Sequence, residues 1–291
     1  MKSYLPILAA CISTAMGGAV AVATRAIVDV VDPVSMGVIR YGIATLCLVP
    51  VALLVGRYNF KRADLLPMAA LGVMFFGIFP VGFAMSLKYT TAGQGALVLS
   101  LMPVLNMSFS ALLKREIITP RKVLGAACIV AGVTMVVDLS AEQSGDAFIG
   151  NAIMFLMAIL GAMFNTLARP YLQRYNQLQA TSWFMLSGWL VLFAVTVATG
   201  SLSFSVPPVD TWWVLLFIGS LGGAFPIFLF NWALGHIESS LVSVALGLNP
   251  LTAAILGVWL LSEPFTWSLA AGLAFVLLGI TFANWRSQKY A

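Results

Sequence analysis

The chain has 291 residues, of which 61% are hydrophobic and only 9% are charged. A water-soluble domain carries roughly a quarter charged residues to keep its surface in water, so this composition excludes a soluble fold. The net charge of +5 comes from Lys and Arg residues that form no extended basic patch interleaved with aromatic residues, so no nucleic-acid partner is expected.

Ten apolar segments follow one another along the chain. A helix that crosses the hydrocarbon core of a bilayer needs ~20 apolar residues, because only a helix satisfies its own backbone polar groups in lipid. The ten segments cover approximately residues 5–29, 33–55, 64–88, 91–114, 120–138, 147–171, 178–200, 211–235, 238–261 and 265–285. The predicted fold class is an all-α integral membrane protein with ten transmembrane helices and no soluble domain.

The distribution of Lys and Arg predicts the orientation of these spans. With the amino terminus in the cytoplasm, twelve of the 15 basic residues fall at the inner side, which is the asymmetry that the positive-inside rule describes. The twelve are Lys2, Arg57, Lys61, Arg62, Lys114, Arg115, Arg121, Lys122, Arg169, Arg174, Arg286 and Lys289. Both termini are therefore expected in the cytoplasm, with the lipid bilayer around the spans.

The two halves of the chain resemble each other. At an offset of 147 residues, 89–136 aligns with 236–283 without a gap and gives ten identities in 48 pairs. The least trivial identities are Pro103 with Pro250, Glu116 with Glu263, Thr119 with Thr266, Gly125 with Gly272, Gly132 with Gly279, and Thr134 with Thr281; at an offset of 146, Gly77, Phe79 and Pro80 align with Gly223, Phe225 and Pro226. The chain is predicted to consist of two five-helix repeats, 1–140 and 141–291.

An odd number of spans in each repeat places the second repeat upside down relative to the first. The loops agree with this, because the basic residues around Glu116 have no counterpart around Glu263. Inverted repeats around one central cavity can exchange between inward-open and outward-open states, so the pattern predicts a transporter that works by alternating access. The fold alone does not name the substrate.

These features together resemble the drug/metabolite transporter superfamily, in its EamA-like branch. The resemblance covers the whole chain and rests on the five-plus-five arrangement, Pro103 and Pro250, the loops 113–116 and 260–264, and the glycines of spans five and ten. The general appearance is most similar to bacterial amino-acid exporters, including those for aromatic amino acids. The resemblance implies ten helices around a central cavity, export across the bacterial cytoplasmic (inner) membrane, and an amino acid as the favoured small-molecule substrate.

Residues that disturb a helix lie near the middle of several spans. These candidate hinge residues are Gly17, Gly18, Pro80, Pro103, Pro226 and Pro250. Each proline removes one helix hydrogen bond, so the freed carbonyl needs a neighbouring helix, a hydroxyl or water. Any one of them can be an ordinary kink, whereas their near-symmetric placement in the two halves favours hinges for some of them.

Polar and aromatic side chains at similar depth are the candidates for contact with the substrate. They are Thr14, Phe79, Ser100, Asn106, Asn165, Trp183, Phe225, Asn231 and Asn249. An amide in hydrocarbon needs a partner, so each asparagine either holds helices together or faces a wet pathway. The aromatic rings either form an apolar wall or contact an ammonium group, or they are simply core or lipid-facing residues.

Two ionisable residues have open roles. Arg40 lies inside span two at a depth of about 10 Å, from a rise of 1.5 Å per residue. A charge there is costly unless it is paired or hydrated, so Arg40 either reaches outward to Asp29, Asp32 or loop carbonyls, or attracts a substrate carboxylate. His236, the only histidine, is either an ordinary boundary residue or a group that titrates near neutral pH.

The ten Asp and Glu residues fall at span ends or in loops, so no buried carboxylate offers itself as a proton or sodium relay. Transport without tight proton coupling is expected, and a proton-coupled exporter of drugs or other metabolites in the same superfamily is the alternative. No cluster of catalytic groups converges, and the three cysteines form no CxxC pair, so no enzyme, metal site or cofactor is predicted. A channel is a further alternative, and the oligomeric state is left open.

Overall fold

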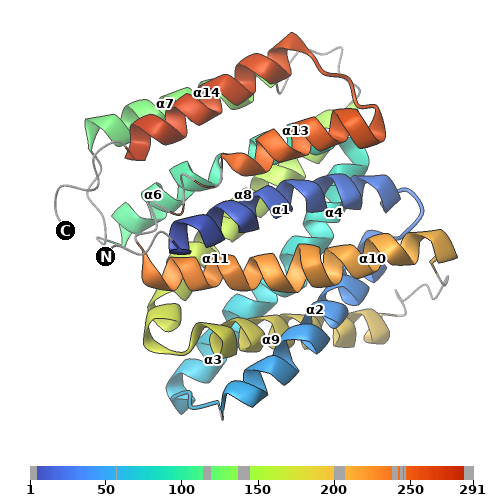
Figure 1. Cartoon of the computed structure of the whole chain (residues 1–291), viewed down its shortest axis with the longest axis vertical. Coiled ribbons are helices and arrows are strands. Elements are labelled where there is room, and N and C mark those ends of the chain that lie inside the picture. The colour runs from blue at the N-terminus through green and yellow to red at the C-terminus, as the bar shows by residue number, and fades with distance from the viewer. Residues whose placement is uncertain are drawn as a thin grey trace.

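The computed structural model describes residues 5–56, 58–113, 119–136, 145–199, 207–237, 242, 245 and 247–284. Within these ranges the chain forms helices and no β-strand, which confirms the all-α prediction. Figure 1 shows the helices side by side in one bundle, with the first turn of α1 (Leu5–Ile27) and the last turn of α14 (Trp267–Asn284) at the same end.

Breaks divide several of the spans into shorter helices. Up to residue 140 the further elements are α2 (Pro33–Val55), α3 (Arg62–Gly72), the π-helix η1 (Val73–Ile78), α4 (Phe79–Tyr89), α5 (Ala92–Leu99), α6 (Met102–Leu112) and α7 (Pro120–Val136). Beyond it they are α8 (Gly145–Arg174), α9 (Gln177–Ala198), the 3-10 helix η2 (Val209–Thr211), α10 (Trp212–Gly219), the π-helix η3 (Ser220–Ala224), α11 (Phe225–His236) and α13 (Leu248–Leu261).

Within the described ranges, seven continuous helical stretches are long and apolar enough to cross a membrane. They occupy the ranges predicted for spans one to four and six to eight: Leu5–Ile27, Pro33–Val55, Arg62–Tyr89, Ala92–Leu112, Asp146–Arg174, Gln177–Ala198 and Val209–His236. Three shorter apolar helices, Val123–Gly132, Leu248–Leu261 and Trp267–Gly279, lie where spans five, nine and ten are predicted. The protein is a multi-pass membrane protein, and the count of ten spans stays a prediction.

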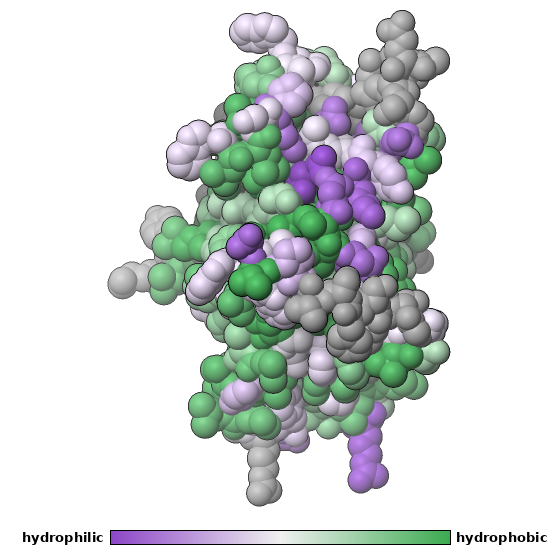
Figure 2. Space-filling model, turned by 90° about the vertical axis from the view of Figure 1, so that its right-hand side faces the viewer, coloured by the Kyte–Doolittle hydropathy of each residue, from purple (hydrophilic) through white to green (hydrophobic). Residues whose placement is uncertain are grey.

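The outside of the bundle is apolar. Trp267 is 90% exposed and Leu54 is 87% exposed, and many other large hydrophobic side chains share this surface. Figure 2 views the right-hand end of the bundle in Figure 1; hydrophilic residues gather in its upper middle part, while hydrophobic residues cover much of its flanks. Such large apolar surface is a liability in water and is the expected surface of helices that face lipid.

The four predicted hinge prolines stand near the start of a helical segment. Pro80 and Pro226 are the second residues of α4 and α11, each directly after a π-helix. Pro103 is the second residue of α6 after a break at 100–101, and Pro250 is the third residue of α13. In its first turn a helix does not use the N–H that proline lacks, so proline is tolerated there. The prolines mark discontinuities, and their action as hinges remains a prediction.

Residues up to 140 form the first part of the chain, and those beyond 140 form the second part. Helices from these two parts pack on one another in matching pairs. α1 packs on α11 and α13, while α8 packs on α4 and α6. α2 packs on α10, α9 packs on α3, and α7 packs on α14. If the two parts are exchanged, the contacts of α1 become those of α8 and the contact of α2 becomes that of α9. The pair of α7 and α14 stays the same. Two inverted repeats related by a twofold axis would give this pattern.

Candidate substrate cavity

A cavity of about 160 Å³ lies among helices from both parts of the chain. Residues from α1, α2, η1, α4 and the α5–α6 break form its walls together with residues from α8, η3, α11 and α13. They are Ser13, Thr14, Gly17, Val20, Arg40, Phe75, Phe79, Phe83, Leu99, Met102, Phe164, Asn165, Gly222, Pro226, Ile227, Phe230, Asn231 and Asn249. The two parts of the chain therefore share one central space.

Two hydroxyl groups of α1 hold neighbouring segments at the cavity. The Ser13 hydroxyl donates to the Pro226 carbonyl at 2.6 Å, next to the break between η3 and α11. The Thr14 hydroxyl lies 2.6 Å from the Ala245 carbonyl and 2.9 Å from the Ala10 carbonyl of its own helix. The Ser13 contact joins α1 to α11, and the Thr14 contact joins α1 to Ala245.

The approach of α1 to α13 involves both predicted hinge glycines, Gly17 and Gly18. A β-carbon on Gly17 would lie 2.6 Å from the side-chain nitrogen of Asn249, and one on Gly18 would lie 2.4 Å from its backbone carbonyl oxygen. At Gly18 only glycine fits, because the obstructing atom belongs to the backbone. The Asn249 side-chain oxygen is buried, and no described residue donates a hydrogen bond to it. A buried acceptor without a donor is rare in folded proteins.

The other two asparagines of the cavity differ in their partners. Asn231 is 1% exposed and donates from its amide nitrogen to the Thr181 hydroxyl at 3.0 Å, which joins α11 to α9. Asn165 is also buried, yet its amide makes no hydrogen bond within the described part of the chain. Asn231 therefore acts as a helix-joining residue, whereas Asn165 presents unpaired donors and an acceptor to the cavity.

Phenylalanine rings form one wall of the cavity. Phe75, Phe79 and Phe83 stand four residues apart along η1 and α4, with ring centroids 4.8 Å and 5.9 Å apart in succession. The Phe75 ring also stacks on Phe164 of α8 at 4.4 Å, with an angle of 12° between the ring planes. This wall is suited to an aromatic or alkyl group of a substrate.

Arg40 faces this cavity rather than the acidic residues named as its outer partners. Asp29 pairs with Arg25 at 2.8 Å, and the Asp32 carboxylate accepts two backbone N–H groups at the start of α2. The Arg40 guanidinium lies 5.2 Å from the ring centre of Tyr41, and its Nε is buried without a hydrogen-bond partner among the described residues.

Several predicted contact residues do not line the cavity. The Ser100 hydroxyl donates to the Ala96 carbonyl within its own helix. Asn106 is buried in α6, and its side-chain oxygen has no partner in the described ranges. The Trp183 indole N–H donates to the Leu65 carbonyl at 3.4 Å, which joins α9 to α3.

Phe225 and His236 lie toward the surface. Phe225 is 47% exposed, although its alignment partner Phe79 lines the cavity. His236 is exposed at the end of α11, where its Nδ1 lies 2.7 Å from the Trp232 carbonyl. Neither residue takes part in the cavity wall. Among the described residues, no group of three or more His, Cys, Asp or Glu side chains could hold a metal ion.

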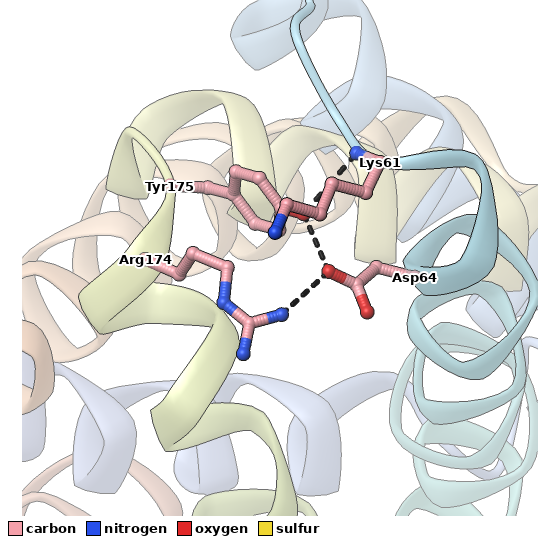
Figure 3. Close-up of polar contacts among 4 residues, drawn as sticks. All are labelled: Lys61, Asp64, Arg174 and Tyr175. Carbon is pink, nitrogen blue, oxygen red and sulfur yellow. Dashed lines mark hydrogen bonds and ion pairs between the residues drawn. The ribbon is translucent and has the colours of Figure 1, made fainter.

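A second polar cluster joins the start of α3 to the end of α8. The Asp64 carboxylate accepts hydrogen bonds from Arg174 at 2.7 Å and from the Tyr175 hydroxyl, and the backbone N–H of Lys61 donates to the same hydroxyl at 3.1 Å. Figure 3 shows Asp64 facing Arg174 and Tyr175 across the gap between the two helices. The cluster ties the two parts of the chain together at one end of the bundle.

A groove lies between α3 and α8 and includes Asp64 and Arg174 of this cluster. It is lined by Asp64, Pro67, Ala70, Leu71, Met74, Leu167, Pro170, Tyr171 and Arg174. The cavity is lined by residues that are close in sequence to those of the groove. Phe75 directly follows Met74, and Phe164 lies one helical turn before Leu167. The stacked rings of Phe75 and Phe164 therefore lie within one helical turn of residues that line the groove.

The sequence matches the EamA-like transporter family over residues 4–138 and 148–285. The chain belongs to this family. An uncharacterized transporter of Archaeoglobus fulgidus is 28% identical to this EamA-like protein over 86% of the chain and 87% of its own length. The uncharacterized transporter YcxC of Bacillus subtilis is 26% identical over 78% and 74%.

One more distant relative carries a functional name. A probable terminal-alkyne amino-acid exporter of Streptantibioticus cattleyicolor is 24% identical over 87% of this chain and 88% of its own length. A protein of known crystal structure superposes on this chain with a TM-score of 0.74 at 18% sequence identity. The match covers 96% of this chain and 96% of the other. This likeness shows the fold, and the family shows that the chain is a membrane transporter.

Proposed function

We propose that this EamA-like transporter exports amino acids across the cytoplasmic membrane by alternating access, without tight coupling to protons and without chemical change of the substrate. The observation that carries the proposal is the central cavity between the two parts of the chain, which is lined both by unpaired amides and by phenylalanine rings. An amino acid has a polar end for the amides and a side chain for the wall.

The proposed mechanism uses residues 1–140 and 141–291 as inverted repeats that rock around the cavity. The matching pairs of helices on either side of the cavity support this arrangement. α1 begins and α14 ends at one end of the bundle (Figure 1), and the excess of Lys and Arg in the loops at that end favours the cytoplasm. Export then requires the cavity to open there first and to the outside afterwards.

The amide groups and the named relative support an amino acid as the substrate. Asn165 and Asn249 offer both donors and acceptors, which an ammonium and a carboxylate group need in a site that excludes most water. The S. cattleyicolor relative is named as a probable exporter of a terminal-alkyne amino acid. We propose a related substrate class for this chain.

The charge of the cavity supports transport without proton coupling. None of the residues that line it in the described part of the chain is Asp, Glu or His. A proton relay through hydrocarbon needs such groups, so the substrate would move down its own gradient.

Reconstitution in liposomes tests the proposal. Vesicles preloaded with an unlabelled amino acid should take up the labelled compound by saturable counterflow, and the compound should be recovered unchanged. Phenylalanine, leucine and alanine are suitable probes. A channel would equilibrate the label without counterflow, and uphill uptake driven by a pH gradient alone would refute the uncoupled mechanism. Tags after residues 116 and 263 should report opposite compartments.

A further inference from the structure

Arg40 is an intramembrane cation whose charge has no anionic partner among the described residues. It is the eighth residue of α2, about 10 Å from the start of that helix at 1.5 Å per residue. Both ion pairs found in the described ranges, Arg25 with Asp29 and Arg174 with Asp64, involve other residues. The ring of Tyr41 is the one described group that interacts with its charge.

An unpaired guanidinium at this depth is unfavourable, because a charge loses hydration and gains no counter-charge. A structural arginine would recover that loss through hydrogen bonds, whereas the Nε of Arg40 is buried without one. Asp32, the nearest acidic residue along α2, is already engaged by backbone N–H groups. The cavity therefore has an uncompensated positive charge in its wall.

We infer that Arg40 binds the carboxylate of the substrate, so that the cavity selects organic carboxylates with an apolar group over amines and neutral analogues. This inference rests on the proposed function, because it takes the cavity as the place where the transported molecule sits. A guanidinium offers a planar set of donors that matches a carboxylate, and such charge-assisted bonds are among the strongest hydrogen bonds in proteins.

The other walls of the cavity fit the rest of such a molecule. Phe79 and Phe83 line the cavity together with Arg40 and offer an apolar surface for a side chain. Asn165 lines it with an unpaired amide whose oxygen can accept a hydrogen bond from an ammonium group. An ammonium group therefore adds to binding, while the carboxylate is the group that the cavity requires.

Matched ligands separate the charge from the shape of the molecule. The ligands are 3-phenylpropanoate with its neutral isostere 3-phenylpropanamide, and L-phenylalanine with L-phenylalaninamide. Binding is measured on purified protein in lipid nanodiscs through the rise in thermal unfolding temperature with ligand concentration. We expect each carboxylate to bind the wild-type protein at least about tenfold more tightly than its amide, because a hydrogen bond to a charged group contributes roughly 1.5–3 kcal/mol and about 1.4 kcal/mol is tenfold.

Three variants complete the test. Arg40→Gln should remove the preference for carboxylates, Arg40→Lys should keep part of it, and Arg25→Gln should keep all of it, because Arg25 pairs with Asp29 outside the cavity. Without ligand, Arg40→Gln should unfold at the same or a higher temperature than the wild type, since it removes an unpaired charge. A structural role for Arg40 predicts a lower unfolding temperature instead.

The inference is overturned if acids and amides bind equally, if no carboxylate of the panel binds, or if Arg40→Gln keeps the preference. Counterflow measured on the same preparations distinguishes this from failure of the proposed function. Carboxylate binding that depends on Arg40 without any counterflow would leave the binding site in place and remove the transport proposal. Amino-acid counterflow that is unaffected by Arg40→Gln would keep the transport proposal and remove Arg40 from the binding site.

Discussion

Gly132 of α7 lies against the backbone of Gly272 of α14, where a β-carbon on Gly132 would come within 2.6 Å of the Gly272 carbonyl oxygen. A β-carbon on Gly279 would meet the carbonyl oxygen of Gly125 at the same distance. In the alignment of the two halves Gly132 matches Gly279 and Gly125 matches Gly272. The two contacts therefore exchange with each other, as they would across a twofold axis between α7 and α14.

These contacts predict that small residues are required where α7 crosses α14. Gly132→Ala and Gly279→Ala should each lower the free energy of unfolding by about 1–3 kcal/mol, because a rigid backbone carbonyl blocks the added methyl group. Ala127→Val adds methyl groups to an exposed position of α7 and should change stability by less than about 0.5 kcal/mol. Unfolding in mixed micelles measures all three. Equal stability of Gly132→Ala and Ala127→Val would contradict the close backbone contact.

The asparagines of the cavity should separate into a stabilising residue and substrate-binding residues. Asn231→Ala leaves the buried Thr181 hydroxyl without its donor and should lower stability by about 1–3 kcal/mol. Asn165→Ala removes an amide without a described partner, so it should keep stability and weaken substrate binding in titrations of the purified protein. A loss of stability in Asn165→Ala comparable to that of Asn231→Ala would show that Asn165 also holds helices together.

The aligned pair Phe79 and Phe225 predicts a difference in substrate affinity. Phe79→Ala should weaken the binding of phenylalanine by roughly 3–10-fold relative to alanine, because an aromatic contact contributes about 0.5–1.5 kcal/mol beyond its buried area. Phe225→Ala removes the same ring from a half-exposed position outside the cavity and should leave this ratio unchanged. Competition in counterflow measures both ratios. A change of the same size in Phe225→Ala would argue against the Phe79 wall.

The sequence predicted the apolar helices because the length of an apolar segment depends on local composition. It did not predict the direction in which each side chain points around its helix. Asn106 and Asn165 both lie at the proposed depth, and only Asn165 lines the cavity. That direction depends on the helix crossings, which are tertiary contacts.

A periodic signal was nevertheless present at the aromatic wall. Phe75, Phe79 and Phe83 recur every four residues, which places them on one face of a helix. This spacing could have added Phe75 and Phe83 to the candidates. No comparable signal marks Ser13, Met102 or Phe164, whose place in the cavity depends on contacts between the two parts of the chain.

The cluster around Asp64 predicts a latch at the end of the bundle that we assign to the cytoplasm. Asp64 belongs to the first part of the chain and Arg174 to the second, so opening of the groove between α3 and α8 requires their ion pair to separate. An exposed ion pair contributes little by itself, and the Tyr175 hydrogen bond to Asp64 adds to it. Asp64→Asn should therefore raise the population open at this end by roughly 2–5-fold.

Thiol labelling measures that population. A cysteine in place of Met74, deep in the groove, is introduced after Cys11, Cys47 and Cys128 are replaced by serine, and a membrane-impermeant maleimide is added to inside-out vesicles. Asp64→Asn should accelerate labelling, and the exchange of the two charges in Asp64→Arg with Arg174→Asp should slow it again. Arg62→Gln, a charge change at the start of the same helix, should leave the rate unaltered. If Asp64→Asn labels no faster than this control, the ion pair does not hold the groove shut.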